Sequence, residues 1–185
     1  MSRYNLLLLI TLPFSLASTS ASAAPTYFDL RIPASACRPI EEDVGKVRLS
    51  DGAWIFSTGQ SGTVTLFCPL HTSEPQSLED SDYIATMRLW YKDPDGTGTN
   101  SSVSATLKRR KFDASVDTSI AGGTVTSQSF SDTTFHRPGV FVDHVTNFLD
   151  FSYHVEITLT RPSSSNATPV FVGKDFAPAP QRPAP

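Results

Sequence analysis

Alternation of apolar and polar residues dominates the chain from residue 27 onward, and it predicts β-strands rather than helices. The clearest strand covers residues 153–160, where odd-numbered positions are apolar and even-numbered positions are polar. In a strand over 63–68 the same period places Val64, Leu66 and Cys68 on the core face. The other predicted strands cover residues 27–32, 44–49, 53–56, 83–91, 103–108, 140–142, 148–151 and 170–173, with weaker strands around Val116 and Val125.

Short segments rich in Gly, Pro, Asp and Ser separate these strands. Residues 50–52, Ser-Asp-Gly, predict a tight hairpin between the strands over 44–49 and 53–56. No helical period lies between the strands, so the sequence predicts an all-β fold, an antiparallel β-sandwich or jelly roll. This domain is expected to cover residues 24–176, and the Pro- and Ala-rich residues 177–185 are expected to form a disordered tail.

Residues 1–23 have the composition of a secretory signal peptide. Arg3 is followed by a short apolar run over 6–14 and then by small residues, and we expect cleavage after Ala23. The run is too short for a transmembrane helix, which needs about 20 apolar residues, and no membrane span is expected in the mature chain. The sequence therefore predicts an exported protein, periplasmic or extracellular.

The chain has two cysteines, Cys37 and Cys68. In an oxidising compartment an isolated pair of this kind predicts one structural disulfide. Closing a loop of this length would stabilise the fold by about 3–4 kcal/mol in the chain-entropy estimate.

The charge balance argues against nucleic acid as a partner, because 15 basic residues face 18 acidic residues. The one basic run, residues 108–111, is interpreted as a solvated strand end.

Residues 93–100 could bind a cation. Asp93, Asp95 and Thr97 occupy alternate positions of a tightly turning segment, as calcium-binding loops require. However, Ser104 stands where such a loop would carry a bidentate Glu, and Pro-Asp-Gly is itself a strong turn signal. A plain turn is the favoured interpretation, with no cofactor expected, and calcium is kept as the alternative.

Two groups of titratable residues could support catalysis. His144 follows Asp143, while His154 and Glu156 share one face of the strand over 153–160. No third partner can be placed beside them, so a solvent-facing polar pair is favoured for His154 and Glu156. The nucleophile elbow of serine hydrolases is absent, because residues 59–62 depart from its spacing.

Trp90 is the candidate for stacking on a sugar ring. If the odd-numbered residues over 83–91 form the core face, Trp90 faces solvent. The opposite assignment buries Trp90, which is the commoner arrangement for tryptophan in a β-sandwich.

The chain resembles a group of small, uncharacterised exported bacterial proteins. The resemblance rests on the signal peptide, on residues 62–69 around Cys68, on the Tyr-x-Asp-Pro-Asp-Gly-Thr-Gly turn over 91–98, and on residues 158–161. It implies no activity. The sequence favours a non-catalytic binding or surface-associated module of the bacterial envelope or extracellular space, with a glycan or an envelope protein as partner. The alternative is a secreted polysaccharide-active hydrolase or lyase that uses His144, His154 and Glu156.

Overall fold

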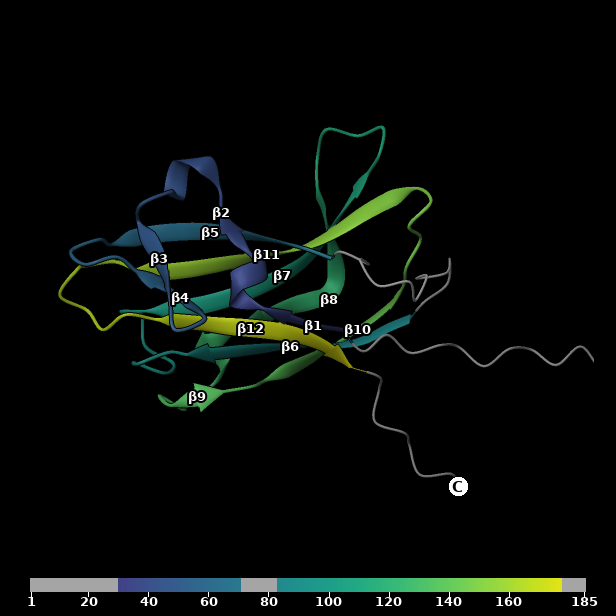
Figure 1. The fold of residues 1–185 in the computed structure, drawn as a ribbon. Helices are drawn as coiled ribbons and strands as arrows, with labels where there is room; N and C mark the ends of the chain where they lie inside the picture. The colour runs from purple at the N-terminus through teal and green to yellow at the C-terminus, as the bar shows by residue number, and fades with distance from the viewer. Residues whose placement is uncertain (1–29, 71–82, 178–185) are drawn as a thin grey trace, which may run out of the picture.

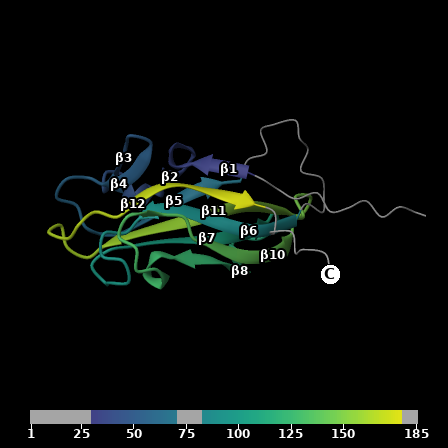
Figure 2. The same cartoon turned by 90° about the horizontal axis from the view of Figure 1, so that it is seen from below.

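The computed structural model describes residues 30–70 and 83–177, which form two antiparallel β-sheets packed face to face (Figure 1). In the described part of the chain, sheet A has the order β10-β6-β12-β4-β3, with β1 paired to β12 and β9 paired to β6, and sheet B has the order β2-β5-β11-β7-β8. The strands run along the long axis of the molecule in both views (Figure 1, Figure 2). The predicted all-β sandwich with one disulfide is confirmed.

The strands are β1 Leu30–Pro33, β2 Arg38–Pro39, β3 Val47–Ser50, β4 Ala53–Phe56, β5 Gly62–Pro69, β6 Tyr83–Lys92, β7 Ser102–Lys111, β8 Thr118–Thr126, β9 Phe135–His136, β10 Gly139–Val145, β11 Phe151–Arg161 and β12 Val170–Ala177. The described residues also form three short 3₁₀ turns: η1 Ala34–Ala36, η2 Glu41–Asp43 and η3 Ser127–Ser129. No helix in the described residues is long and apolar enough to cross a membrane.

The apolar residues of the alternating strands fill the space between the two sheets, as the sequence predicts. Val64, Leu66 and Cys68 of β5 are fully buried, and they lie beside the equally buried Val155 and Ile157 of the neighbouring β11. The hairpin between β3 and β4 is also confirmed. Its two turn residues, Asp51 and Gly52, both have positive φ, which Asp tolerates and Gly favours.

The predicted strand around Val116 is wrong. Val116 lies in an exposed bend before β8, which begins at Thr118, and Arg110 binds Asp117 in the same loop. The predicted strand over 148–151 is mostly wrong as well, because residues 148–150 form a turn held by a hydrogen bond from the Phe151 amide to the Asn147 carbonyl.

β12 is longer than the predicted strand over 170–173. It contains a register shift between Phe171 and Gly173, after which Lys174 and Phe176 face the core. The strand ends at Ala177, the residue at which the tail was expected to begin. The remaining tail residues 178–185, the expected signal peptide and residues 71–82 lie outside the described residues.

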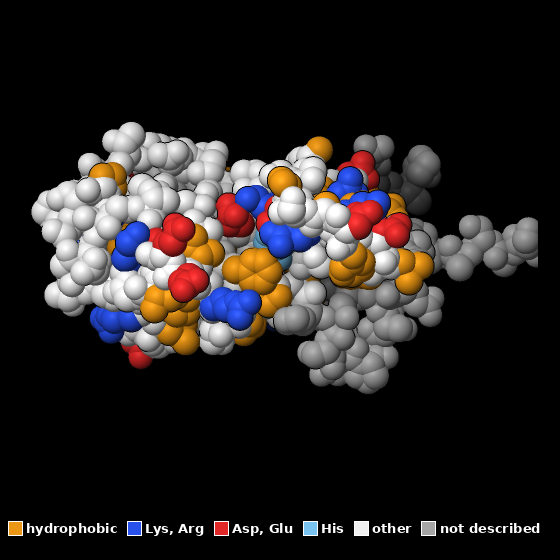
Figure 3. Space-filling model, turned by 90° about the horizontal axis from the view of Figure 1, so that it is seen from above, with side chains coloured by type: hydrophobic (Ala, Val, Ile, Leu, Met, Phe, Trp, Pro, Cys, Tyr) orange, Lys and Arg blue, Asp and Glu red, His pale blue; other side chains and the backbone are white. Residues whose placement is uncertain are grey.

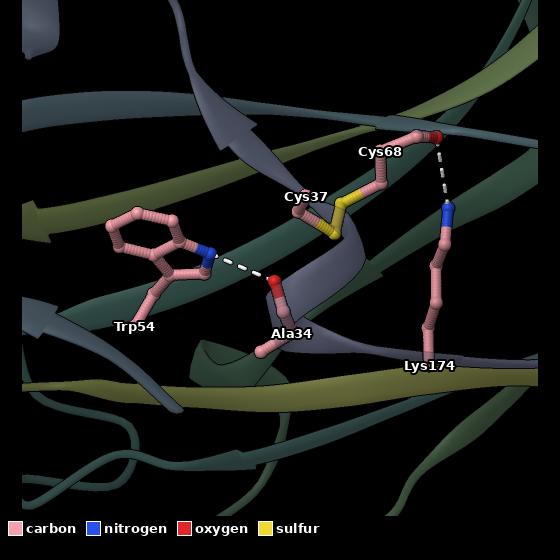
Figure 4. The surroundings of a disulfide bond; sticks show 5 residues. All are labelled: Ala34, Cys37, Trp54, Cys68 and Lys174. Atoms are coloured by element: carbon pink, nitrogen blue, oxygen red, sulfur yellow. Dashed lines mark hydrogen bonds between the residues drawn. A yellow bond between two sulfur atoms is a disulfide. The ribbon is translucent and has the colours of Figure 1, made fainter. Parts of the chain in front are cut away.

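The predicted disulfide joins Cys37 and Cys68, with a Cα–Cα distance of 4.2 Å. Figure 4 shows that two further contacts fix its surroundings. The Trp54 indole nitrogen donates to the Ala34 carbonyl at 2.8 Å, and Lys174 Nζ donates to the Cys68 carbonyl at 3.3 Å. The disulfide therefore ties the segment that precedes β2 to the inner face of β5.

Candidate functional site

The outer face of β6 presents Trp90 to solvent. Met87, Leu89 and Tyr91 of the same strand are fully buried in the core, so the intervening Trp90 must point outward. Its side chain is 41% exposed. The assignment that buries Trp90 is therefore wrong, because the odd-numbered residues of this strand fill the core.

Asp175 holds the Trp90 ring in position. It projects from β12 beside β6, is 1% exposed, and its Oδ1 accepts a hydrogen bond from Trp90 Nε1 at 2.9 Å. Two guanidinium groups share this carboxylate: Arg137 Nη2 lies 2.6 Å from Oδ2, and Arg88 Nη2 lies 2.9 Å from it. We call these four residues (Trp90, Asp175, Arg88 and Arg137) the Trp90 cluster.

Burial alone would raise the pKa of the Asp175 carboxyl. The hydrogen bonds from Arg137 and Trp90 and the nearby charge of Arg88 outweigh burial, and they hold this pKa below its usual value. Asp175 is therefore ionised at neutral pH. The Arg137 guanidinium in turn lies 4.4 Å from the centre of the Trp90 ring, in cation–π geometry. The ring is thus fixed by a hydrogen bond at its edge and by a cation over one face.

A pocket of about 500 Å³ adjoins Trp90. Its lining is largely apolar, and its charged member is Asp51 of the β3–β4 hairpin. Phe135 of β9, which is 64% exposed, adds a second aromatic ring at the pocket. The lining residues are Ser50, Asp51, Ala53, Ile55, Trp90, Phe135, Val170 and Val172.

Sequence reasoning singled out Trp90 but missed its partners. Arg137 lies 47 positions from Trp90 in a segment without alternation, and Asp175 follows the register shift in β12. The only local sign of Asp175 in the sequence is a carboxylate between Lys174 and Phe176 near the end of a strand. Only the pairing of β12 with β6 shows that it meets Trp90.

The calcium candidates form an internally bonded turn. Ser101 Oγ lies 2.6 Å from both Asp93 Oδ1 and Asp95 Oδ1, and the Asn100 amide donates to Asp95 Oδ2 at 2.6 Å. Thr97 is exposed at the tip of the turn. A Cβ at Gly98 would clash with Asp95 Oδ2, so a side chain at this position would displace the carboxylate from its hydrogen bonds.

Asp93 is fully buried, and burial raises the pKa of its carboxyl. It also accepts a hydrogen bond from Ser127 Oγ, which connects the turn to η3. Burial and the charges of Asp93 and Asp132 raise the pKa of Tyr91 to about 12. Within the described residues, no group of three or more His, Cys, Asp or Glu side chains is placed to hold a metal ion.

His154 and Glu156 do share the outer face of β11, but His154 is not solvent-facing. It is 4% exposed, and its ring stacks on Phe67 with the centroids 4.6 Å apart. Burial lowers the pKa of the His154 imidazole, against the opposing charge of Asp117, whose Oδ2 lies 3.5 Å from Nε2. Glu156 pairs with Lys108 at 2.7 Å. A substrate cannot reach the His154 ring in this arrangement.

The third proposed catalytic residue, His144, lies on β10 of the opposite sheet. The structure therefore divides the three residues between two sheets. His144 does not pair with the adjacent Asp143, because the Asp143 carboxylate accepts a hydrogen bond from the Tyr83 hydroxyl. His144 Nε2 lies 3.2 Å from the Tyr153 hydroxyl instead.

The side of the molecule that carries β2 and β5 shows a mixture of residue types. Hydrophobic, acidic and basic side chains intermingle on it (Figure 3). In the basic run, which forms the end of β7 as predicted, Arg110 pairs with Asp117 at 2.7 Å and Lys111 with Asp113 at 2.9 Å. Because several of its cations already have carboxylate partners, the run does not form a free basic patch.

These features define a disulfide-linked β-sandwich with a fixed, half-exposed tryptophan beside an apolar pocket. No known protein family and no curated protein matches the sequence. The solved structures to which this chain is similar include these two. One is a xylan-binding module, CBM15, with 11% identity and a TM-score of 0.46 over 84% of this chain and 99% of that chain.

The other is a family two carbohydrate esterase from Cellvibrio japonicus, with 17% identity and a TM-score of 0.38 over 84% of this chain. This chain spans 37% of the esterase chain.

Proposed function

We propose that the protein is an exported, non-catalytic binding module that recognises a glycan by stacking a sugar ring on Trp90. The carrying observation is that a half-exposed indole is fixed in place before any ligand arrives. Its edge is bonded to Asp175 and one ring face is covered by Arg137. A fixed ring loses little conformational freedom on binding, so more of the contact energy appears as affinity.

The composition of the Trp90 pocket suits a neutral sugar. A pyranose ring has an apolar C–H face, which matches Ile55, Val172 and the rings of Trp90 and Phe135. Its hydroxyl groups need acceptors at the rim, which Ser50 and the Asp51 carboxylate provide. A few polar groups around a mainly apolar lining are typical of small-ligand sites.

The burial of His154 and its separation from His144, which lies on the opposite sheet, favour binding over catalysis, because the catalytic candidates do not meet at one accessible site. Export is part of the proposal. It is supported by the disulfide between Cys37 and Cys68, a bond that persists in oxidising compartments, and by the composition of residues 1–23.

A glycan array probed with the purified mature protein tests the proposal. We expect binding to a set of neutral glycans and its loss, by tenfold or more, in Trp90→Ala, since truncation of an aromatic anchor in a binding site costs about 2 kcal/mol or more. Phe112→Ala removes an exposed aromatic outside the pocket and is expected to bind normally. Equal binding by Trp90→Ala, or cleavage of the bound glycans, would exclude this function.

A further inference from the structure

Arg109 is a cation on the core-facing side of a strand. In β7 the residues at alternate positions before it, Val103, Ala105 and Leu107, are fully buried between the sheets. Arg109 continues this series, and its register partner on β11 is the buried Tyr153. Its guanidinium therefore lies at the end of the inter-sheet space rather than on the outer face of sheet B.

Arg109 differs from its neighbours in the basic run, because Lys108, Arg110 and Lys111 each pair with a carboxylate at 2.7–2.9 Å. Among the residues that the structure describes, Arg109 has no carboxylate partner, and its recorded contact is with the Phe151 ring, 4.5 Å from Cζ. A guanidinium strongly favours a planar, bidentate anion.

His144 approaches the same space from the opposite sheet. β10 is irregular between Phe141 and His144, and Asp143 there has a φ of 49°. The Tyr153 hydroxyl accepts a hydrogen bond from the Asn147 amide at 3.0 Å and lies 3.2 Å from His144 Nε2. Burial and the charge of Arg109 lower the pKa of His144, which keeps the ring neutral at neutral pH.

A pocket of about 500 Å³ lies where these groups meet. It is lined by residues of β7, β8 and β10, among them Arg109, Ser119, Ile120, Val142, Asp143 and His144. Arg109 and Ser119 supply hydrogen-bond donors, and Ile120 and Val142 supply apolar surface. The Asp143 carboxylate is bonded to the Tyr83 hydroxyl.

We propose that this pocket binds a small ligand through a carboxylate group, to which the Arg109 guanidinium donates two hydrogen bonds. Asp143 would disfavour a second negative charge, so the site selects monoanions over dianions. None of its lining residues belongs to the Trp90 pocket. The two sites are therefore tested independently, and failure of one leaves the other standing.

The test is a calorimetric titration of Trp90→Ala, which lacks the proposed neutral-sugar site, with glucuronate, acetate, glucose and sulfate at constant ionic strength. The Arg109 and Arg110 variants are made in the same background. We expect glucuronate and acetate to bind with dissociation constants of about 1 mM, and glucose and sulfate to bind at least tenfold more weakly. Comparison of acetate with glucuronate shows whether the carboxylate alone is enough for binding or whether the sugar ring contributes. Tighter binding of glucuronate would identify a sugar acid as the ligand class.

Arg109→Gln is expected to weaken glucuronate at least tenfold, whereas the matched control Arg110→Gln, on the outer face of β7, is expected to bind normally. If Arg109→Gln does not fold, amide shifts of Ser119 and His144 in the unmodified protein provide the second measurement. Equal binding of glucose and glucuronate, unchanged binding by a folded Arg109→Gln, or shifts confined to other residues would overturn the proposal.

Discussion

Ser127 is a single buried hydroxyl on which several polar groups depend. It donates to the buried Asp93 carboxylate and accepts from the Val103 amide at 2.9 Å. Ser127→Ala leaves that amide unpaired and removes a donor from a buried carboxylate, so we expect the free energy of unfolding to fall by about 1–3 kcal/mol. Urea denaturation measures the loss. Ser129→Ala, an exposed position of the same 3₁₀ turn, is the matched control, and an equal effect there would contradict the assignment.

Lys174 is the least expected residue of the core. Its side chain is 1% exposed, its ammonium has the Cys68 carbonyl as an acceptor at 3.3 Å, and burial lowers its pKa well below the usual value. Lys174→Met keeps much of the volume and removes a desolvated amino group, so we expect stabilisation of about 1–3 kcal/mol. Thermal unfolding against Lys111→Met, an exposed control, measures it. A lower melting temperature for Lys174→Met would show that the ammonium is needed where it lies.

His154 makes stability depend on pH. Burial holds the pKa of its imidazole below 6.5 in the folded protein, so the unfolded chain binds the proton more readily. Its contribution is therefore complete above pH 6.5 and falls as the pH decreases through 6.5. We expect His154→Gln to lose less stability than the unmodified protein between about pH 8 and pH 5.5. Denaturant unfolding at each pH measures this, and parallel pH curves would contradict it.

At the scale of elements, sequence predicted those strands whose pattern matches their environment. The sequence of β11 alternates cleanly because one face of the strand packs in the core, and the β3–β4 hairpin carries its own turn residues. β12 departs from the pattern because its register shift exchanges the faces within one strand. A strand was predicted around Val116 because this residue is apolar. Val116 is exposed, however, and β8 begins only at Thr118.

The candidate sites were predictable to different degrees. Alternation allowed Trp90 on either face of β6, and only the full burial of the residues on either side of it places it on the outer face. Asp175 and Arg137 reach Trp90 through pairing between distant segments, which no local pattern encodes. Arg109 did have a local signal, a cation that continues the apolar face of β7, but its significance depends on His144 across the sheets.

The segment over 93–101 is best explained as a self-sufficient turn. Asp93 Oδ1 and Asp95 Oδ1 share the single proton of the Ser101 hydroxyl, and Asp95 Oδ2 also accepts from the Asn100 and Ser101 amides. A cation would have to displace these donors, so we expect the melting temperature to be the same in excess calcium and in chelator. A rise in melting temperature with calcium that is abolished in Asp95→Asn would establish a calcium site instead.

At the scale of the whole molecule, the core and the two candidate pockets lie in different parts of the sandwich. The inner faces and the disulfide form the core, the outer face of sheet A carries the Trp90 cluster, and the Arg109 pocket lies at the end of the inter-sheet space. A rigid two-sheet scaffold can hold two such sites without coupling them, because their lining residues differ. Each site is therefore open to mutation on its own.

Fluorescence of a protein with Trp90 as its single tryptophan tests the central claim most directly. Trp54→Phe removes the other tryptophan, which lies beside the disulfide (Figure 4). Titration of this variant with a glycan selected on the array is predicted to change the intensity and shift the emission to shorter wavelength, with saturation at the concentration at which binding saturates. An unchanged Trp90 spectrum at saturating glycan would contradict the account, because the sugar would then bind away from Trp90.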